Sequence, residues 1–168
     1  MYDMLVLNMY NTAYRILGNK EDTQDCLQNG FTLIFTKIHK YDPDKGTIWS
    51  WAKRIVINEC LGMLRKKKIK FQELPESLSI IDEDVSMLEM MEAEYLFQLI
   101  NELPYQLRII FNLYEIEGYA HKEIAEKLEI VESSSRTYLT RAKAKLKSKI
   151  KMYLSTDQAI VKPRYKKM

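Results

Sequence analysis

The sequence predicts an all-α protein with two small helical domains joined by an acidic linker. Glycine and proline are scarce, with five and four among 168 residues, whereas β-sandwiches and barrels need many turns. Apolar residues recur at three- and four-residue spacing along most of the chain, which is typical of amphipathic helices. Residues 71–100 hold eight acidic side chains and no lysine or arginine, between two segments with a net positive charge. This charge pattern is unlike that of one uniform domain.

We therefore expect four segments. A first helical domain covers residues 1–70, and a flexible acidic linker covers residues 71–87. A second helical domain covers residues 88–155, and a basic tail covers residues 156–168. The linker is placed where apolar periodicity is lost and acidic residues gather.

The first two helices follow from apolar spacing and capping residues. Residues 2–17 carry an apolar stripe, and Gly18 is a natural C-terminal stop. Asn19 can cap the next helix, which has acidic residues in its first turn and an apolar stripe ending at Ile38.

A third helix should run from Ile48 to about Lys68, after a turn-rich loop at residues 41–46 and a capping Thr47. Tryptophans interleaved with cations at residues 45–68 suit single-stranded DNA, because rings stack on unpaired bases while cations hold phosphates. Trp51 shares the apolar stripe and is expected in the core, whereas the position of Trp49 stays open. The side chain of Asn58 is either satisfied internally or faces a partner.

The second domain begins with a helix near Val85 and continues with a helix that has Pro104 in its first turn. Tyr114 is expected to point inward, and Gly118 to end that helix. A final helix should carry one apolar face up to Ile150, and the tail from Asp157 is expected to fray.

The clearest local signal is a helix-turn-helix. A short helix at residues 122–128, a tight break at residues 129–132 and a second helix from Ser133 have the required spacing. Small polar residues at the start of this helix can enter a major groove, and Arg136 and Arg141 can reach bases or phosphates. Residues 133–156 contain seven cations and no acid. An ordinary solvated basic helix is the alternative, which the preceding short helix and break make less favoured.

Several functional classes are excluded by the same reading. Cys26 and Cys60 lie 34 positions apart with no CxxC pair, so neither a disulfide scaffold nor a zinc ribbon is expected, and two free thiols suit a reducing cytoplasm. The chain shows no signal peptide and no stretch long enough for membrane insertion. His39 and His121 are expected at the surface, and no metal, cofactor or catalytic residue is predicted.

Together these residues resemble the extracytoplasmic-function sigma factors, the minimal form of the sigma-70 family, over about residues 5–150. The segments similar to region 2 are residues 15–28, 31, 41–46, 51, 54–55, 58 and 64–66. The segments similar to region 4 are residues 103–104, 117–118, 122–125, 128, 130, 136, 139 and 141–142. Glu129 stands where the family has a turn glycine.

The resemblance implies a role for each site. Core RNA polymerase would be bound by Asp25, Gln28 and Asn29, which match the helix that docks on the clamp coiled coil of the largest subunit. The −10 element would be opened, and one base captured, by Lys45, Gly46, Thr47, Trp49, Lys53, Arg54, Asn58, Arg65 and Lys66. The −35 element would be read by Ser133, Ser134, Ser135, Arg136, Thr137, Tyr138, Arg141, Lys143 and Lys147. The acidic linker matches a segment that threads the polymerase cleft, where it can occupy a basic nucleic-acid channel.

The expected function is that of a cytoplasmic promoter-specificity subunit that is not an enzyme. Its expected partners are core RNA polymerase, double-stranded and melted promoter DNA, and an anti-sigma factor. A helix-turn-helix repressor or activator with an N-terminal dimerisation or sensor domain explains residues 119–147 equally well. It leaves the loop at residues 41–46, Trp49 and the acidic linker without a role. A helical nucleic-acid enzyme would need a carboxylate or histidine cluster to hold a metal, and the sequence has none.

Overall fold

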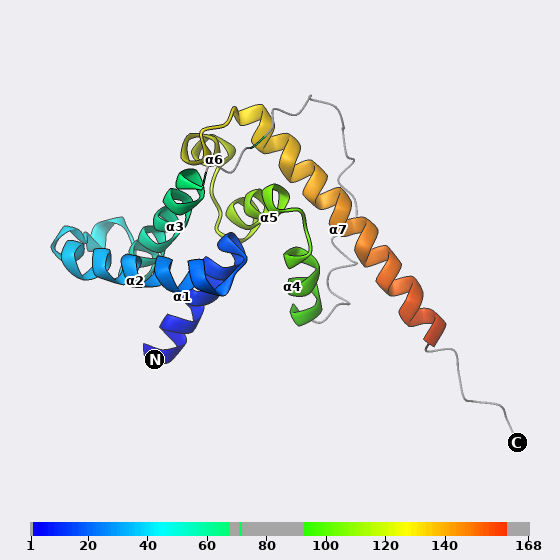
Figure 1. Cartoon of the computed structure of the whole chain (residues 1–168), viewed down its shortest axis with the longest axis horizontal. Helices are drawn as coiled ribbons and strands as arrows, with labels where there is room; N and C mark the ends of the chain where they lie inside the picture. Colours follow the sequence, from blue (N-terminus) through cyan, green and yellow to red (C-terminus); the bar gives the residue numbers. More distant parts are fainter. Residues whose placement is uncertain (1, 68–70, 72–92, 161–168) are drawn as a thin grey trace, which may run out of the picture.

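A computed structural model describes residues 2–67, 71 and 93–160 of the chain. These residues form helices and no strand, which confirms the predicted all-α class. The helices are α1 (Tyr2–Leu17), α2 (Lys20–Lys37), α3 (Ile48–Lys66), α4 (Ala93–Asn101), α5 (Tyr105–Phe111), α6 (His121–Leu128) and α7 (Glu132–Ile160). Figure 1 shows α1–α3 on one side of the molecule and the long α7 crossing the other.

The N-terminal helices begin and end where the sequence predicts. Gly18 follows α1 with φ +78°, a left-handed conformation that favours glycine. The side chain of Asn19 accepts a hydrogen bond from the Asp22 backbone N–H at 2.9 Å, and that of Thr47 accepts one from the Ser50 N–H at 3.2 Å. Each cap satisfies a backbone donor that the first helical turn leaves without a partner.

The N-terminal domain packs α1, α2 and α3 against one another. Its core contains Ile16, Ile57 and Leu61, all nearly inaccessible to solvent. The Sγ atoms of Cys26 on α2 and Cys60 on α3 lie 2.9 Å apart as buried free thiols. The hydrogen bond between the two thiols, and then burial, raise the pKa of Cys60 well above its usual range.

The C-terminal domain packs α4, α5 and α6 along α7. Pro104 precedes α5 as its N-cap residue rather than lying in its first turn. A π-helical turn, Asn112–Ile116, continues α5 and leaves Tyr114 exposed. The inward orientation expected for Tyr114 is therefore wrong, because a π-helical turn changes the spacing on which the expectation relied. Helix α7 also runs past Asp157 to Ile160.

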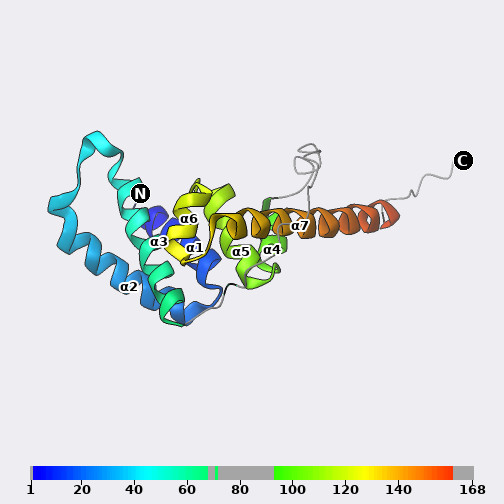
Figure 2. The same cartoon turned by 90° about the horizontal axis from the view of Figure 1, so that it is seen from above.

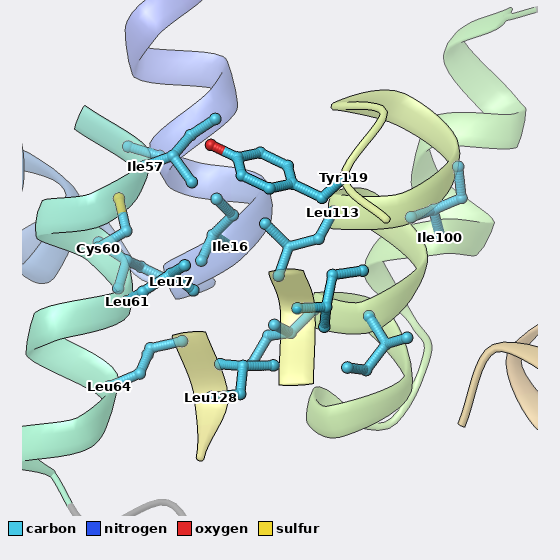
Figure 3. Packing of buried hydrophobic residues seen from close by; sticks show 14 of the residues in the cluster. Ile16, Leu17, Ile57, Cys60, Leu61, Leu64, Ile100, Leu113, Tyr119 and Leu128 are labelled. Atoms are coloured by element: carbon cyan, nitrogen blue, oxygen red, sulfur yellow. The ribbon is translucent and has the colours of Figure 1, made fainter. Parts of the chain in front are cut away.

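The two domains are joined by one buried apolar cluster. Helix α5 packs on α1, and α6 packs on α3. Figure 3 shows the Tyr119 ring, from the segment before α6, directed toward Ile16 of α1 and Ile57 of α3. The guanidinium of Arg108 lies against Gly18, where a Cβ would be 2.1 Å from one of its nitrogens. The N- and C-terminal helices thus meet at a close-packed junction.

Much of the predicted linker lies outside the described residues. Phe71 is described, and its ring meets that of Tyr138 edge-on, with ring centroids 5.5 Å apart. Residues 72–87, the expected start of α4 near Val85 and residues 161–168 of the predicted tail fall on parts that the structure does not describe. The domain boundaries themselves stay a prediction.

Candidate nucleic-acid interface

The outer face of α7 carries part of the residues predicted to read the −35 element. Ser133, Arg136 and Lys143 are exposed, and Arg141 and Lys147 are partly exposed. Positions 133, 136, 140, 143 and 147 follow helical spacing and share this face. Arg136 pairs with Glu132, and Lys143 pairs with Glu115 at 2.9 Å. Internal carboxylates therefore hold two of these cations in the free protein.

Four residues predicted for the same site point into the protein. Ser134, Ser135, Thr137 and Tyr138 are all less than 10% exposed, and Ser135 is completely covered. In this arrangement their side chains cannot reach DNA. The apolar stripe of α7 gives the reason, since Ser135 lies four positions before Leu139 and Tyr138 lies four positions before Ala142, and both of these residues are buried.

The covered face of α7 packs on α6 through a histidine. The Nδ1 atom of His121 lies 2.9 Å from the Ser135 Oγ, and the ring stacks on Tyr114 with centroids 4.3 Å apart. The surface position expected for His121 is wrong, because it begins α6 at the contact with α7. Burial first, and then the positive charge of Arg136, lower the pKa of His121 below its usual value.

The turn between α6 and α7 is tight, as predicted. Helix α6 ends at Leu128, and Glu129 takes a left-handed conformation with φ 57° and ψ 44°. A glycine would adopt this conformation without steric cost, whereas a residue with a side chain is strained there. Glu123 accepts a hydrogen bond from the Ala120 backbone N–H at 2.9 Å, which satisfies one donor at the start of α6. The helix-turn-helix therefore forms without the turn glycine.

The loop before α3 is held by its own hydrogen bonds. Asp42 accepts from the Asp44 backbone N–H at 3.1 Å and pairs with Lys45 at 2.9 Å. The Tyr41 hydroxyl donates to the Gly46 carbonyl at 3.1 Å, and Gly46 has φ +129°. Figure 2 shows this segment at the end of the molecule opposite the C-terminal end of α7. The loop therefore projects from the protein in a conformation that its own hydrogen bonds hold, and the Lys45 side chain on it is exposed.

Helix α3 presents the other residues predicted for the −10 element. Trp49 and Trp51 are partly buried against the core, and Tyr41 packs on Trp51 with ring centroids 5.8 Å apart. Arg54 and Lys66 are exposed. The two tryptophans therefore belong to the edge of the core.

Three further residues of this group contact the C-terminal domain. Lys53 pairs with Glu117 at 2.6 Å, and Asn58 accepts a hydrogen bond from the Lys127 Nζ at 2.6 Å. Arg65 donates to the Lys127 backbone carbonyl at 3.0 Å. The open question about Asn58 is thus answered for this arrangement, because an intramolecular partner satisfies its oxygen.

Comparisons with known proteins agree with this geometry. Residues 1–69 match the family model described as Sigma-70 region 2, and residues 93–146 match the model described as Sigma-70, region 4. The chain belongs to the sigma-70 family. Within it, the chain is an extracytoplasmic-function sigma factor, and such a factor acts in promoter recognition and transcription initiation with RNA polymerase.

Individual relatives support the same assignment. The chain is 28% identical to the ECF RNA polymerase sigma factor SigE of Mycolicibacterium smegmatis, over 83% of this chain and 56% of that protein. It is 26% identical to the ECF sigma factor SigM of Bacillus subtilis, over 88% of this chain and 91% of that one. The fold is similar to that of the sigma factor RpoE of Bartonella quintana, solved with the anti-sigma factor NepR, with a TM-score of 0.53 and 15% identity. That match covers 88% of this chain and 92% of the other.

The residues that this sigma factor is predicted to use for core polymerase lie on α2. Asp25, Gln28 and Asn29 are all exposed, and their spacing places them on one face. Within the described part of the chain, no group of histidine, cysteine and acidic residues could hold a metal ion. No helix among the same residues is long and apolar enough to cross a membrane.

Sequence reasoning missed three residues that the structure makes prominent. Glu117 was noted only as part of a motif, yet it joins the two domains. Lys127 had no assigned role, and it contacts two residues of α3. Thr140 lies on the outer face of α7 between Arg136 and Lys143, where helical spacing alone could have identified it.

Proposed function

We propose that this sigma factor reads the −35 element with the outer face of α7 and opens the −10 element with α3 and its preceding loop. The observation that carries the −35 assignment is the alignment of Ser133, Arg136 and Lys143 on the exposed face of the second helix of a helix-turn-helix. Small residues at the helix start let the backbone approach base edges, while the cations contact bases and phosphates.

The −10 assignment rests on the chemistry of α3 and its loop. Lys45, Arg54 and Lys66 are exposed cations that can hold the phosphates of a displaced strand. A loop shaped by internal hydrogen bonds, with Gly46 in a conformation that favours glycine, can hold a concavity for one extruded base. The energy of unstacking one base is a few kcal/mol, which such contacts can offset.

We further propose that Asp25, Gln28 and Asn29 bind core polymerase, that the chain catalyses no reaction itself, and that it acts in the cytoplasm, where polymerase and promoters meet. An anti-sigma factor is a proposed partner, supported by the neighbouring structure that contains one. The alternative of a repressor or activator predicts no promoter-specific start with core polymerase.

The test is run-off transcription from genomic fragments with core polymerase and the full chain. We expect defined starts that require the added chain. Asn58→Ala should leave binding to core polymerase nearly normal and reduce permanganate reactivity of −10 thymines, because opening needs contacts to the unpaired strand. A pre-melted promoter should restore much of the activity. Unchanged permanganate reactivity would remove Asn58 from the proposed site.

A further inference from the structure

Two buried thiols face each other between helices of the N-terminal domain. Cys26 of α2 and Cys60 of α3 are both completely covered, and their Sγ atoms lie 2.9 Å apart. The Cys26 Sγ also lies 3.6 Å from the backbone carbonyl oxygen of Val56 on α3. Each sulfur is therefore placed against the other helix, and the two form a pair inside the core.

The packing of the two helices holds this pair in place. Cys26 lies one helical turn before Gly30 on α2, and Cys60 lies one turn after Val56 on α3. A Cβ on Gly30 would come within 3.2 Å of a Val56 side-chain carbon, so the helices approach closely there because Gly30 has no side chain. The next turn of each helix then brings Cys26 opposite Cys60. The contact between the sulfurs thus follows from two regular helices and needs no loop to bring them together.

We propose that Cys26 and Cys60 form a redox site, at which hydrogen peroxide produces an intramolecular disulfide between α2 and α3. One sulfur attacks a peroxide oxygen as the thiolate, which yields a sulfenic acid and, after proton transfer, one water. The other sulfur then attacks the sulfenic sulfur, the S–S bond forms and a second water leaves. In total the two thiols lose two electrons and two protons, and one peroxide is reduced to two waters.

Burial determines which oxidant can act at this site. A large thiol reagent would have to leave a bulky group in the core, whereas hydrogen peroxide is close to water in size and leaves only water. The hydrogen bond to Cys26, and then burial, raise the pKa of Cys60, so Cys60 keeps its proton. Cys26 is therefore the sulfur that we expect to attack the peroxide, with Cys60 completing the disulfide.

The disulfide would link the two helices to which separate binding roles are proposed. Asp25 and Gln28 on α2 and Arg54 on α3 are exposed, whereas both sulfurs lie in the core beneath these surfaces. The bond therefore adds a covalent link without occupying either proposed binding face. By closing the chain between residues 26 and 60, it restricts the unfolded state and stabilises the N-terminal domain under oxidising conditions.

The test treats the full-length chain with hydrogen peroxide in its native state and compares wild type with Cys26→Ala and Cys60→Ala. Peptide mass spectrometry without reductant identifies a link between the two cysteines, and a thiol reagent added in urea measures the remaining thiols. Circular dichroism follows thermal unfolding of oxidised and reduced samples. In wild type we expect loss of both thiols within the monomer, and an unfolding midpoint at least about 4 °C above that of the reduced chain. Neither single variant should show this rise.

The measurements on wild type decide the outcome even where a variant fails to fold. Both thiols still free after peroxide treatment, disulfide-linked dimers, or oxygen added to the cysteine sulfurs in place of the link would each overturn the redox site. A link that forms only in urea would overturn it as well, because the native contact would then not be its cause. A native link with no rise in the unfolding midpoint would contradict the stabilising role.

Discussion

Arg136→Ala should weaken recognition of the −35 element by an amount that follows from its partners in the free protein. A bidentate contact from arginine to a base contributes about 1–3 kcal/mol. Arg136 already pairs with Glu132 one helical turn away, and both side chains are largely solvent-exposed. Breaking such an exposed pair costs about 0.3–0.5 kcal/mol. The net loss is therefore about 0.5–2.7 kcal/mol, or roughly a 2- to 90-fold weaker affinity.

The same reasoning predicts that a substitution of Glu132, the partner of Arg136, strengthens DNA binding. Glu132→Gln removes the competing carboxylate and leaves Arg136 free, so affinity should rise about twofold, the equivalent of the exposed pair. Lys145→Ala is the control for charge, because Lys145 is exposed on α7 but lies off the face shared by Arg136 and Lys143.

The assay uses the full chain with core polymerase and a fluorescent duplex carrying the −35 element of a promoter identified by run-off transcription. Competition with single-base variants of the duplex measures specificity at each position. Arg136→Ala should relax specificity at one position, whereas Lys145→Ala should weaken all duplexes slightly and equally. Promoter choice and affinity that do not change in Arg136→Ala would refute the assignment of the outer α7 face.

Three further predictions concern stability and reactivity. The free energy of unfolding should fall as the pH drops below about 6.5, the ordinary pKa of histidine. Burial lowers the pKa of His121 in the folded protein, so the unfolded chain binds the extra proton more readily. Urea titrations at several pH values should show a smaller fall in His121→Gln than in the wild type. Glu129→Gly should raise the free energy of unfolding by about 0.5–1 kcal/mol, since relief of left-handed strain of about 1–2 kcal/mol exceeds the glycine entropy cost; Glu129→Ala should show no such gain. Cys26 and Cys60 should resist a thiol reagent in the native protein and react in urea, because both thiols are buried; rapid native reaction would contradict the packing of α2 on α3.

Local structure could be predicted because it depends on neighbouring residues. Gly18, Asn19 and Thr47 mark helix ends through backbone conformation and capping hydrogen bonds, and these need no knowledge of the rest of the fold. The break between α6 and α7 was likewise visible from spacing. These features place the helix-turn-helix and the third helix of the N-terminal domain correctly.

The relative placement of the two domains could not be predicted in this way. Contacts such as Glu117 with Lys53 join residues far apart in the chain, and opposite charges alone do not select one pairing among many. The burial of Ser135 and His121 shows a related limit, because a polar residue on an inner helix face resembles a surface residue in the sequence alone. The spacing of Ser135 to Leu139 could have indicated its burial, whereas that of His121 depends on the contact between α6 and α7. Four of the nine residues predicted for the −35 element therefore lie on the inner face of α7.

The apolar junction between the domains has a thermal consequence. Ile16, Ile57, Leu113 and Tyr119 are buried where the domains meet. Separation would expose these side chains to water and therefore raise the heat capacity of the chain. The free energy of closure then varies with temperature along a curve with a maximum, and cooling below this maximum weakens the apolar contact. Temperature therefore changes how strongly the N- and C-terminal helices hold together at this junction.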